Sequence, residues 1–372
     1  MACVFLANVV AEVLRAMRDA FNTDFLSSFF TAADMLRRGD HAIYCSGCLQ
    51  AHAQHLFATG APIFSFQYDN PPLGAWLLQP LTYLSPRIAL ALFLGVSLAA
   101  AAGAAWLLLR QTTRDGRHVL TAVAAFGSLP AGMAFAYGQW DALLALALTG
   151  SYVALRRDRM VLAGVLLSIL LLKPQLVWLV PVVLVIGGRW RVLYGMVAGG
   201  AVMVISSIAV LGWSDAARWL HQISPNIVAR PGISLPHMLA AFGASPAGVV
   251  VASGLLAAGI TLALMRGRTW LRSLTGDRLL SLGVLLSMVA APHLLPYDLI
   301  IVAPVIVLWA RDHSGHALAA AITLSASFLI DLALPASWAI VEAAALVGVA
   351  LLYLSDIAPH HARTLTHAPQ PT

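Results

Sequence analysis

Charged residues are scarce in this chain of 372 residues. They make up 10% of it, whereas a soluble domain usually carries about 25%. Hydrophobic residues make up 60%, and several runs of about 18 or more residues lack any charge. Runs of that length can cross a bilayer, which argues against a soluble protein with a large apolar core. We therefore expect an all-α, polytopic integral membrane protein with about 11–12 membrane helices.

Lysine is almost absent. The single lysine, Lys173, lies inside an apolar run, and the other basic residues are arginines. Most of these arginines lie in short loops between apolar runs. That distribution is typical of the positive-inside rule, so the basic balance indicates membrane topology and no nucleic-acid partner.

Cysteine is also rare, with only Cys3, Cys45 and Cys48. Three cysteines with little clustered histidine are too few for a zinc framework, and we expect no metal and no cofactor. Cys45 and Cys48 could close a small disulfide on an outer face. A redox role is the weaker alternative, because nothing else in the chain resembles a redox domain.

The first 21 residues contain only half of the roughly 20 apolar residues that a span needs. They are either an amphipathic helix at the membrane interface or the C-terminal part of a span that begins upstream. We favour the second interpretation, because Met1 itself interrupts the apolar run.

The remaining chain alternates apolar runs with polar segments within one transmembrane domain, residues 1–354. A first polar segment, residues 22–86, should form an outer loop with short amphipathic helices, and 213–243 should form a second outer loop. Predicted single spans are 87–110, 192–212, 245–265, 316–332 and 336–354. The tail, 355–372, should be disordered and cytoplasmic.

Three further runs, 118–155, 160–187 and 279–310, are predicted hairpins with a polar tip. For 160–187 the alternative is one long helix kinked at Pro174. Arginine clusters at 156–159 and 189–191 flank this run, and a hairpin puts both in the cytoplasm. Assigning the basic loops to the cytoplasm places every polar tip and both outer loops on the opposite face. We therefore predict one active site there.

Ionisable side chains at membrane depth cost about 3 kcal/mol and need a partner or a water-filled cavity. Lys173 could form an ion pair with Asp141 or Asp298, or it could bind a phosphate. Asp24 on its own is more typical of a helix cap or a surface carboxylate. A lone histidine such as His293 is more often structural than catalytic.

Five motifs follow one another along the chain. They are Thr23-Asp24-Phe25 after the first span, YDNPPL at 68–73, GQWD at 138–141, LLKPQ at 171–175 and APHLLPYDL at 291–299. In this order they resemble glycosyltransferase family 87, a polytopic family of the GT-C type. This family includes the polyprenol-phosphate-mannose-dependent α-1,2-mannosyltransferases.

The resemblance implies a hexosyltransferase, such as a mannosyltransferase, in a bacterial inner membrane, with its active site facing the periplasm. It implies a polyprenyl-phosphate sugar donor and a hydroxyl acceptor on a lipid or envelope glycan. Such a donor needs no nucleotide, so the chain needs no glycine-rich phosphate fingerprint.

The resemblance also implies residue roles in an inverting single displacement. Asp24 is the expected general base, with His293 as a second catalytic residue. Lys173 and Arg230 should stabilise the donor phosphate. Residues expected to bind sugar or acceptor, or to support the site, are Tyr68, Asp69, Gln139, Asp141, Tyr297 and Asp298.

A secondary transporter or a lipid flippase is the alternative, because broken helices with ionisable groups suit those proteins as well. We find no internal repeat of the hydropathy pattern. In a transporter the ionisable groups should lie at the bilayer midplane between two repeats. In the enzyme they should lie at the outer surface under short helices of the first loop.

Overall fold

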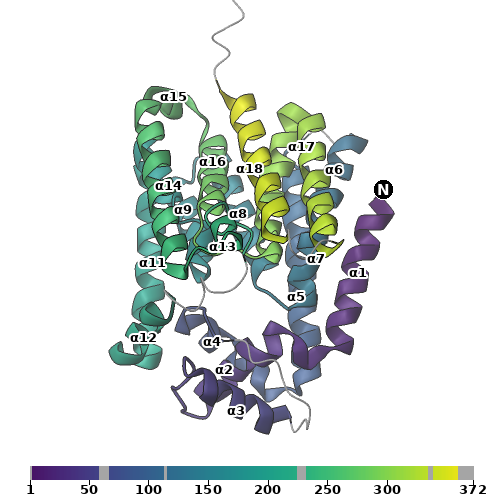
Figure 1. Cartoon of the computed structure of the whole chain (residues 1–372), viewed down its shortest axis with the longest axis vertical. Coiled ribbons are helices and arrows are strands. Elements are labelled where there is room, and N and C mark those ends of the chain that lie inside the picture. The colour runs from purple at the N-terminus through teal and green to yellow at the C-terminus, as the bar shows by residue number, and fades with distance from the viewer. Residues whose placement is uncertain (1, 58–66, 113–114, 224–231, 334–337, 359–372) are drawn as a thin grey trace, which may run out of the picture.

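A computed structural model describes residues 2–57, 67–112, 115–223, 232–333 and 338–358. Within these ranges every regular element is helical, and no strand occurs. Most long helices run side by side in one bundle, while short helices gather at one end of it (Figure 1). The prediction of an all-α, polytopic membrane protein is confirmed.

Five helical stretches in the described ranges are long and apolar enough to cross a membrane. They are Pro86–Leu109, Trp190–Leu211, Pro246–Arg266, Pro296–Ile330 and Ile340–Ile357. A sixth would be the pair α6 (Gly116–Phe126) and α7 (Leu129–Ala136), which is bent by 46°. This count is below the expected 11–12, because the arms of the predicted hairpins are short. Helices α8 (Asp141–Arg156), α9 (Met160–Ser168), α10 (Val180–Ile186) and α16 (Gly276–Val289) have 7 to 16 residues.

Local sequence signals fix where the long helices begin. Helix α5 (Pro86–Leu109) and helix α14 (Pro246–Arg266) each start with proline, which suits a position whose amide has no helical acceptor. Ser245 also caps α14 by accepting a hydrogen bond from the Gly248 amide at 3.2 Å. The single spans predicted at 87–110 and 245–265 therefore agree with α5 and α14.

Residues 160–187 form a hairpin and not one kinked helix. A 3-10 turn, η4 (Ile169–Leu172), ends α9, and η5 (Pro174–Leu176) leads into α10. Helix α9 packs against α11 (Trp190–Leu211) through small residues: Gly164 lies against the backbone of Val192, and Ser168 lies against Gly199. These contacts advance together along both helices, so α9 and α11 are parallel. The intervening α10 must therefore run the other way, and Lys173 lies at the tip.

The first polar segment contains a chain of short helices. They are η1 (Ala20–Asn22), the π-helical η2 (Phe25–Phe30), α2 (Thr31–Arg37), α3 (Ser46–Phe57), α4 (Pro72–Leu78) and η3 (Gln79–Tyr83). Helices α2, α3 and α4 lie together at the lower end of the bundle (Figure 1). This agrees with the prediction of short helices in this loop.

Asp34 holds this group together. Its buried carboxylate accepts hydrogen bonds from Arg38 Nε at 2.6 Å and from Arg37, and it lies 2.9 Å from His52 Nε2. Burial works to raise the pKa of Asp34, but these three contacts outweigh it and hold the pKa below its ordinary value. Because His52 belongs to α3 and Asp34 to α2, the cluster fixes the two helices to each other.

Helix α1 (Ala2–Arg18) lies along the edge of the bundle (Figure 1). The Asn8 side-chain amide donates hydrogen bonds to the carbonyls of Gly127 at 3.2 Å and Ser128 at 3.1 Å, at the bend between α6 and α7. Val10 and Leu14 are exposed on its other face. This helix is therefore packed on the bundle at the bend between α6 and α7.

The second polar segment contains α12 (Trp213–Ile223) and α13 (Met238–Ala241). The rest of the chain adds α15 (Arg268–Ser273), η6 (Pro296–Ile301), α17 (Val302–Ala333) and α18 (Trp338–Ile357). Helix α17 breaks at His313, where the backbone leaves the helical region. Helix α18 continues three residues beyond the domain boundary predicted at residue 354.

Candidate active site

Two predicted site residues from distant motifs, Asp24 and Gln139, are in direct contact. This residue follows η1 and is 7% exposed. Its Oδ2 atom accepts a hydrogen bond from the Gln139 side-chain amide, although 115 residues separate the two in sequence. The Phe25 amide also donates to the Tyr137 carbonyl at 3.2 Å. The loop after the first helix is therefore joined to the tip between α7 and α8.

Gly138 makes this approach possible. Its backbone has φ +64°, a region that favours glycine. A Cβ at this position would lie 2.6 Å from Phe25 Cβ, closer than two such atoms approach in proteins. The glycine therefore allows the tip to turn and to lie directly against Phe25. Gln139 reaches Asp24 as a consequence.

Lys173 lies between two carboxylates that the sequence marked as possible partners. Its Nζ atom is 2.6 Å from Asp141 Oδ2 and 2.8 Å from Asp298 Oδ1. It also lies 4.6 Å from the centroid of the Tyr297 ring. All three charged side chains are buried. This triad is the ion pair that one of the two interpretations of Lys173 expects, and it joins the tips of three hairpins.

Asp298 is held in place from its own turn. Its Oδ2 atom accepts a hydrogen bond from the Leu295 amide at 2.8 Å, while Oδ1 contacts Lys173. Tyr297 stands beside Tyr137, with ring centroids 6.0 Å apart. Because Tyr137 immediately precedes the tip that holds Gln139, the lysine triad and the Asp24 pair are neighbours.

Tyr68 and Asp69 take part in two hydrogen bonds to backbone carbonyls of the turn at 68–72. The fully buried Tyr68 donates its hydroxyl proton to the Pro71 carbonyl at 2.9 Å, within its own turn. Trp219, from the second polar segment, donates its indole N–H to the Asp69 carbonyl at 3.0 Å. These contacts support the turn, so the supporting role in our prediction suits Tyr68 better than direct sugar binding.

Helix α4 rests directly on two of the tips. A Cβ on Gly74 would lie 2.7 Å from Tyr68 Oη and 3.7 Å from both Leu172 and Trp140. Those two residues immediately precede Lys173 and Asp141. The short helices of the first loop therefore cover the site, which is the arrangement expected for the enzyme.

His293 meets a second histidine that the sequence analysis did not select. The rings of His293 and His237 have centroids 6.2 Å apart, and both side chains are buried. The Ile233 amide donates to the Leu294 carbonyl at 2.8 Å and brings the two segments together. The available signal was that His237 lies in an outer loop on the same predicted face. Arg230, predicted from that loop, lies outside the described residues.

An apolar cavity of about 310 Å³ lies beside the hairpin tip that carries Lys173. Its lining includes Pro71, Leu171, Pro174, Met203, Trp213 and Trp219. Thus the YDNPPL turn, the LLKPQ tip and α11 and α12 all contribute to its wall. Leu171 and Pro174 belong to the same tip as Lys173, so the cavity touches that tip.

A family model matches more than half of the chain. The model described as glycosyltransferase family 87 covers residues 68–292. The chain belongs to glycosyltransferase family 87. No curated protein and no solved structure matches it. The protein is therefore a multi-pass membrane glycosyltransferase, which favours the enzyme over the transporter or flippase alternative.

Several predicted residues of this family 87 protein lie outside the matched range. Asp24 precedes it, and His293, Tyr297 and Asp298 follow it. The structure nevertheless brings Asp24 to Gln139 and Asp298 to Lys173, both of which lie inside the matched range. Segments within and beyond the match are thus in direct contact at the candidate site.

Proposed function

We propose that this family 87 protein transfers a hexose, such as mannose, from a polyprenyl-phosphate donor to a hydroxyl of a lipid-linked or envelope glycan. The observation that carries the proposal is the Asp24–Gln139 pair beside the lysine triad. The Gln139 amide donates to the Asp24 carboxylate and so favours its ionised form, which is the form that a general base requires.

The proposed reaction is a single inverting displacement. The acceptor oxygen forms a bond to the anomeric carbon while the bond from that carbon to the phosphate oxygen breaks. Asp24 takes the acceptor proton, and polyprenyl phosphate leaves with the electron pair. We assign His293 to the leaving phosphate together with Arg230.

Lys173 requires a specific step in this scheme. Two carboxylates already neutralise its charge, so binding a phosphate means exchanging one carboxylate contact for a phosphate oxygen. Asp298 is the partner that can be released, because its second oxygen stays bound to the Leu295 amide. Gln139, Asp141 and Tyr297 orient the sugar or hold neighbouring groups in place.

The apolar cavity supports a lipid-linked donor. Its lining is almost entirely hydrocarbon and aromatic, and it starts beside the Lys173 tip. An isoprenoid chain would gain hydrophobic free energy there while its phosphate remained near the lysine. A nucleotide sugar has no comparable use for such a cavity.

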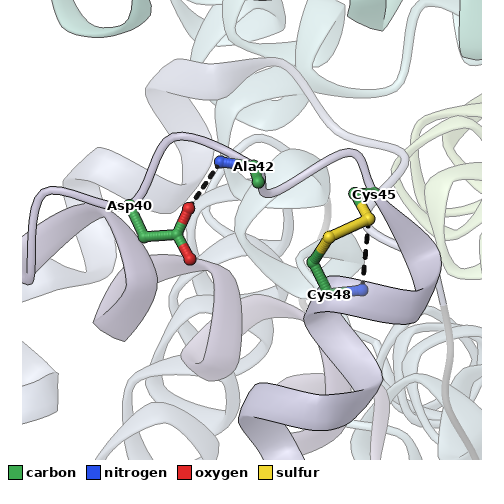
Figure 2. The surroundings of a disulfide bond; sticks show 4 residues. All are labelled: Asp40, Ala42, Cys45 and Cys48. Atoms are coloured by element: carbon green, nitrogen blue, oxygen red, sulfur yellow. Dashed lines mark hydrogen bonds between the residues drawn. A yellow bond between two sulfur atoms is a disulfide. The ribbon is translucent and has the colours of Figure 1, made fainter.

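The disulfide supports an active site on the non-cytoplasmic face. Cys45 and Cys48 are bonded at the start of α3, in the loop that covers the site (Figure 2). Disulfides persist in oxidising compartments and are rare in the cytosol. The same loop carries few basic residues relative to the loops at the opposite end, as the positive-inside rule requires.

The donor is tested with membranes that contain the protein and a radiolabelled sugar. We expect transfer from the polyprenyl-phosphate sugar and none from the corresponding nucleotide sugar. Transfer from the nucleotide sugar alone would contradict the proposed donor. Membranes without the protein provide the background.

Sidedness is tested by cysteine labelling in intact spheroplasts after mild reduction. The exposed Cys3 is first replaced by alanine to remove its signal. We expect a membrane-impermeant maleimide to label Cys45 and Cys48 without permeabilisation. Labelling only after permeabilisation would place the loop in the cytoplasm.

A further inference from the structure

Three metal-ligating side chains converge at the end of the bundle opposite α2–α4. His313 and His316 belong to α17, and Asp356 belongs to α18. Each offers one ligand atom, and these atoms all lie within 4.8 Å of one another. Trp270 of α15 donates to the Ile357 carbonyl at 3.2 Å, which places this cluster at the α15 end (Figure 1). The cluster is therefore far from the candidate active site.

The two histidines point at the same carboxylate oxygen. His316 Nδ1 lies 2.8 Å from Asp356 Oδ2, and His313 Nδ1 lies 3.5 Å from it. Their rings are parallel, with 3° between the planes and 5.9 Å between centroids. Helix α17 breaks at His313 (φ −139°, ψ 64°), and this break turns the His313 ring beside that of His316.

The carboxylate is itself fixed by a neighbour. The Trp309 indole N–H donates to Asp356 Oδ2 at 2.9 Å. Metal ligands are commonly oriented in this way by an outer hydrogen-bond donor or acceptor. The nearby Arg278 and Arg311 both contact Asp312, at 2.9 and 3.6 Å. Their charges are thus partly compensated and do not exclude a cation.

The spacing suits a small transition-metal ion. Zinc binds histidine nitrogen and carboxylate oxygen at about 2.1 Å, so tetrahedral ligand atoms lie about 3.4 Å apart. The two nitrogen–oxygen distances, 2.8 and 3.5 Å, bracket that value. The side chains of His313 and His316 are 34% and 52% exposed, which leaves room for water as a further ligand.

We propose that His313, His316 and Asp356 bind one divalent transition-metal ion, with zinc the ion best matched to two imidazoles and a carboxylate. The ion ties the break in α17 to the end of α18. This site is independent of glycosyl transfer, and its function is to hold two membrane helices together. The alternative is a plain His–Asp contact that binds no metal.

The test uses the full-length protein in detergent, purified with a tag that contains no histidine. The protein is stripped with EDTA, exposed to zinc chloride and freed of unbound metal, and the bound zinc is counted by mass spectrometry. We expect about one zinc per chain, as a single site of this type holds one ion. Cobalt in place of zinc should give the visible absorption bands of a tetrahedral site.

Variants assign the ion to this cluster. His313→Ala with His316→Ala should abolish stoichiometric binding, and Trp309→Phe should weaken it about 10-fold. His55→Ala, at an exposed histidine of α3, is the matched control and should bind as the parent does. A further control replaces His360, His361 and His367 in the tail with alanine and should also retain the ion.

Stability provides a second readout, since an ion that binds only the folded protein raises its melting temperature. Zinc should raise the melting temperature of the parent and of both controls, and leave that of Asp356→Asn unchanged. Absence of stoichiometric zinc from the parent overturns the proposal. Equal zinc binding by the His313/His316 double variant overturns it as well.

Discussion

Two buried carboxylates in the first polar segment have different hydrogen-bond partners. Asp34 is buried at 1% exposure and contacts three basic side chains, those of Arg37, Arg38 and His52. Asp24 is buried nearly as deeply, yet the side chain that binds its Oδ2 is the neutral amide of Gln139. A carboxylate among cations is committed to holding helices together. The Asp24 contact joins two distant motifs instead, and we propose that this carboxylate serves the reaction.

The largest effect should come from Asp24→Asn. This change removes the proposed base but keeps a side chain that can contact Gln139, so the protein should fold normally. Transfer in membranes should fall by at least about 100-fold. Asp40→Asn, at an exposed carboxylate that accepts from the Ala42 amide in the same loop (Figure 2), should leave transfer unchanged. Retained activity in Asp24→Asn would remove this residue from the mechanism.

The lysine triad could serve both stability and donor binding, and two variants separate these two roles. Lys173→Met alone leaves two buried carboxylates facing each other, so it should destabilise the protein and lower kcat/KM for the donor about 10- to 100-fold.

A second variant removes all three charges by combining Lys173→Met with Asp141→Asn and Asp298→Asn. It should recover the melting temperature but not donor use, measured by initial rates at varied polyprenyl-phosphate sugar. Recovery of both would show that the triad is only structural.

Gly138→Ala should disturb the Asp24–Gln139 pair without touching either residue. The added Cβ would lie 2.6 Å from the Phe25 Cβ, and the alanine would also have to adopt φ +64°. Small displacements of reacting groups are costly, and we expect transfer to fall about 10-fold.

The matched control for this change is Gly188→Ala. Gly188 also has a positive φ, of +72°, but a Cβ there would meet nothing within 4 Å. If both variants lose the same activity, backbone strain and not the contact with Phe25 is the cause.

The smallest effect on turnover should come from Asp34→Asn. Loss of its charged hydrogen bonds should lower the free energy of unfolding by about 2 kcal/mol, while the donor KM stays unchanged. Because the folded pKa is below the unfolded value, this stabilisation is complete above about pH 4 and disappears as pH falls further. Thermal unfolding of parent and variant at several pH values measures it. A stability difference that grows toward low pH would contradict the assignment.

The sequence predicted the structure best where the energetic cost of burying a charge and the pattern of charged residues pointed to the same arrangement. A lysine inside an apolar run needs a carboxylate, and the structure supplies both of the predicted partners, Asp141 and Asp298. Arginine clusters on either side of residues 160–187 predicted the hairpin that the parallel packing of α9 and α11 requires. In both cases the penalty for burying charge restricts the possible arrangements.

Other features depend on distances that no local pattern records. Asp356 is 40 residues from His316, and nothing near either residue signals their contact. The contact of His237 with His293 depends on how a loop returns to the η6 turn. The role of Asp34 could not be predicted for the same reason, since His52 contacts it only once α3 packs against α2. Neighbours in space decide these contacts, and composition does not report them.

The position of Lys173 at a hairpin tip has a consequence for the order of synthesis. Asp141 precedes it by 32 residues, whereas Asp298 follows it by 125. The ribosome therefore delivers one counter-ion before the lysine and the other long after it. Until the last predicted hairpin is synthesised, Asp141 is therefore the one of these two carboxylate partners that is present with the lysine.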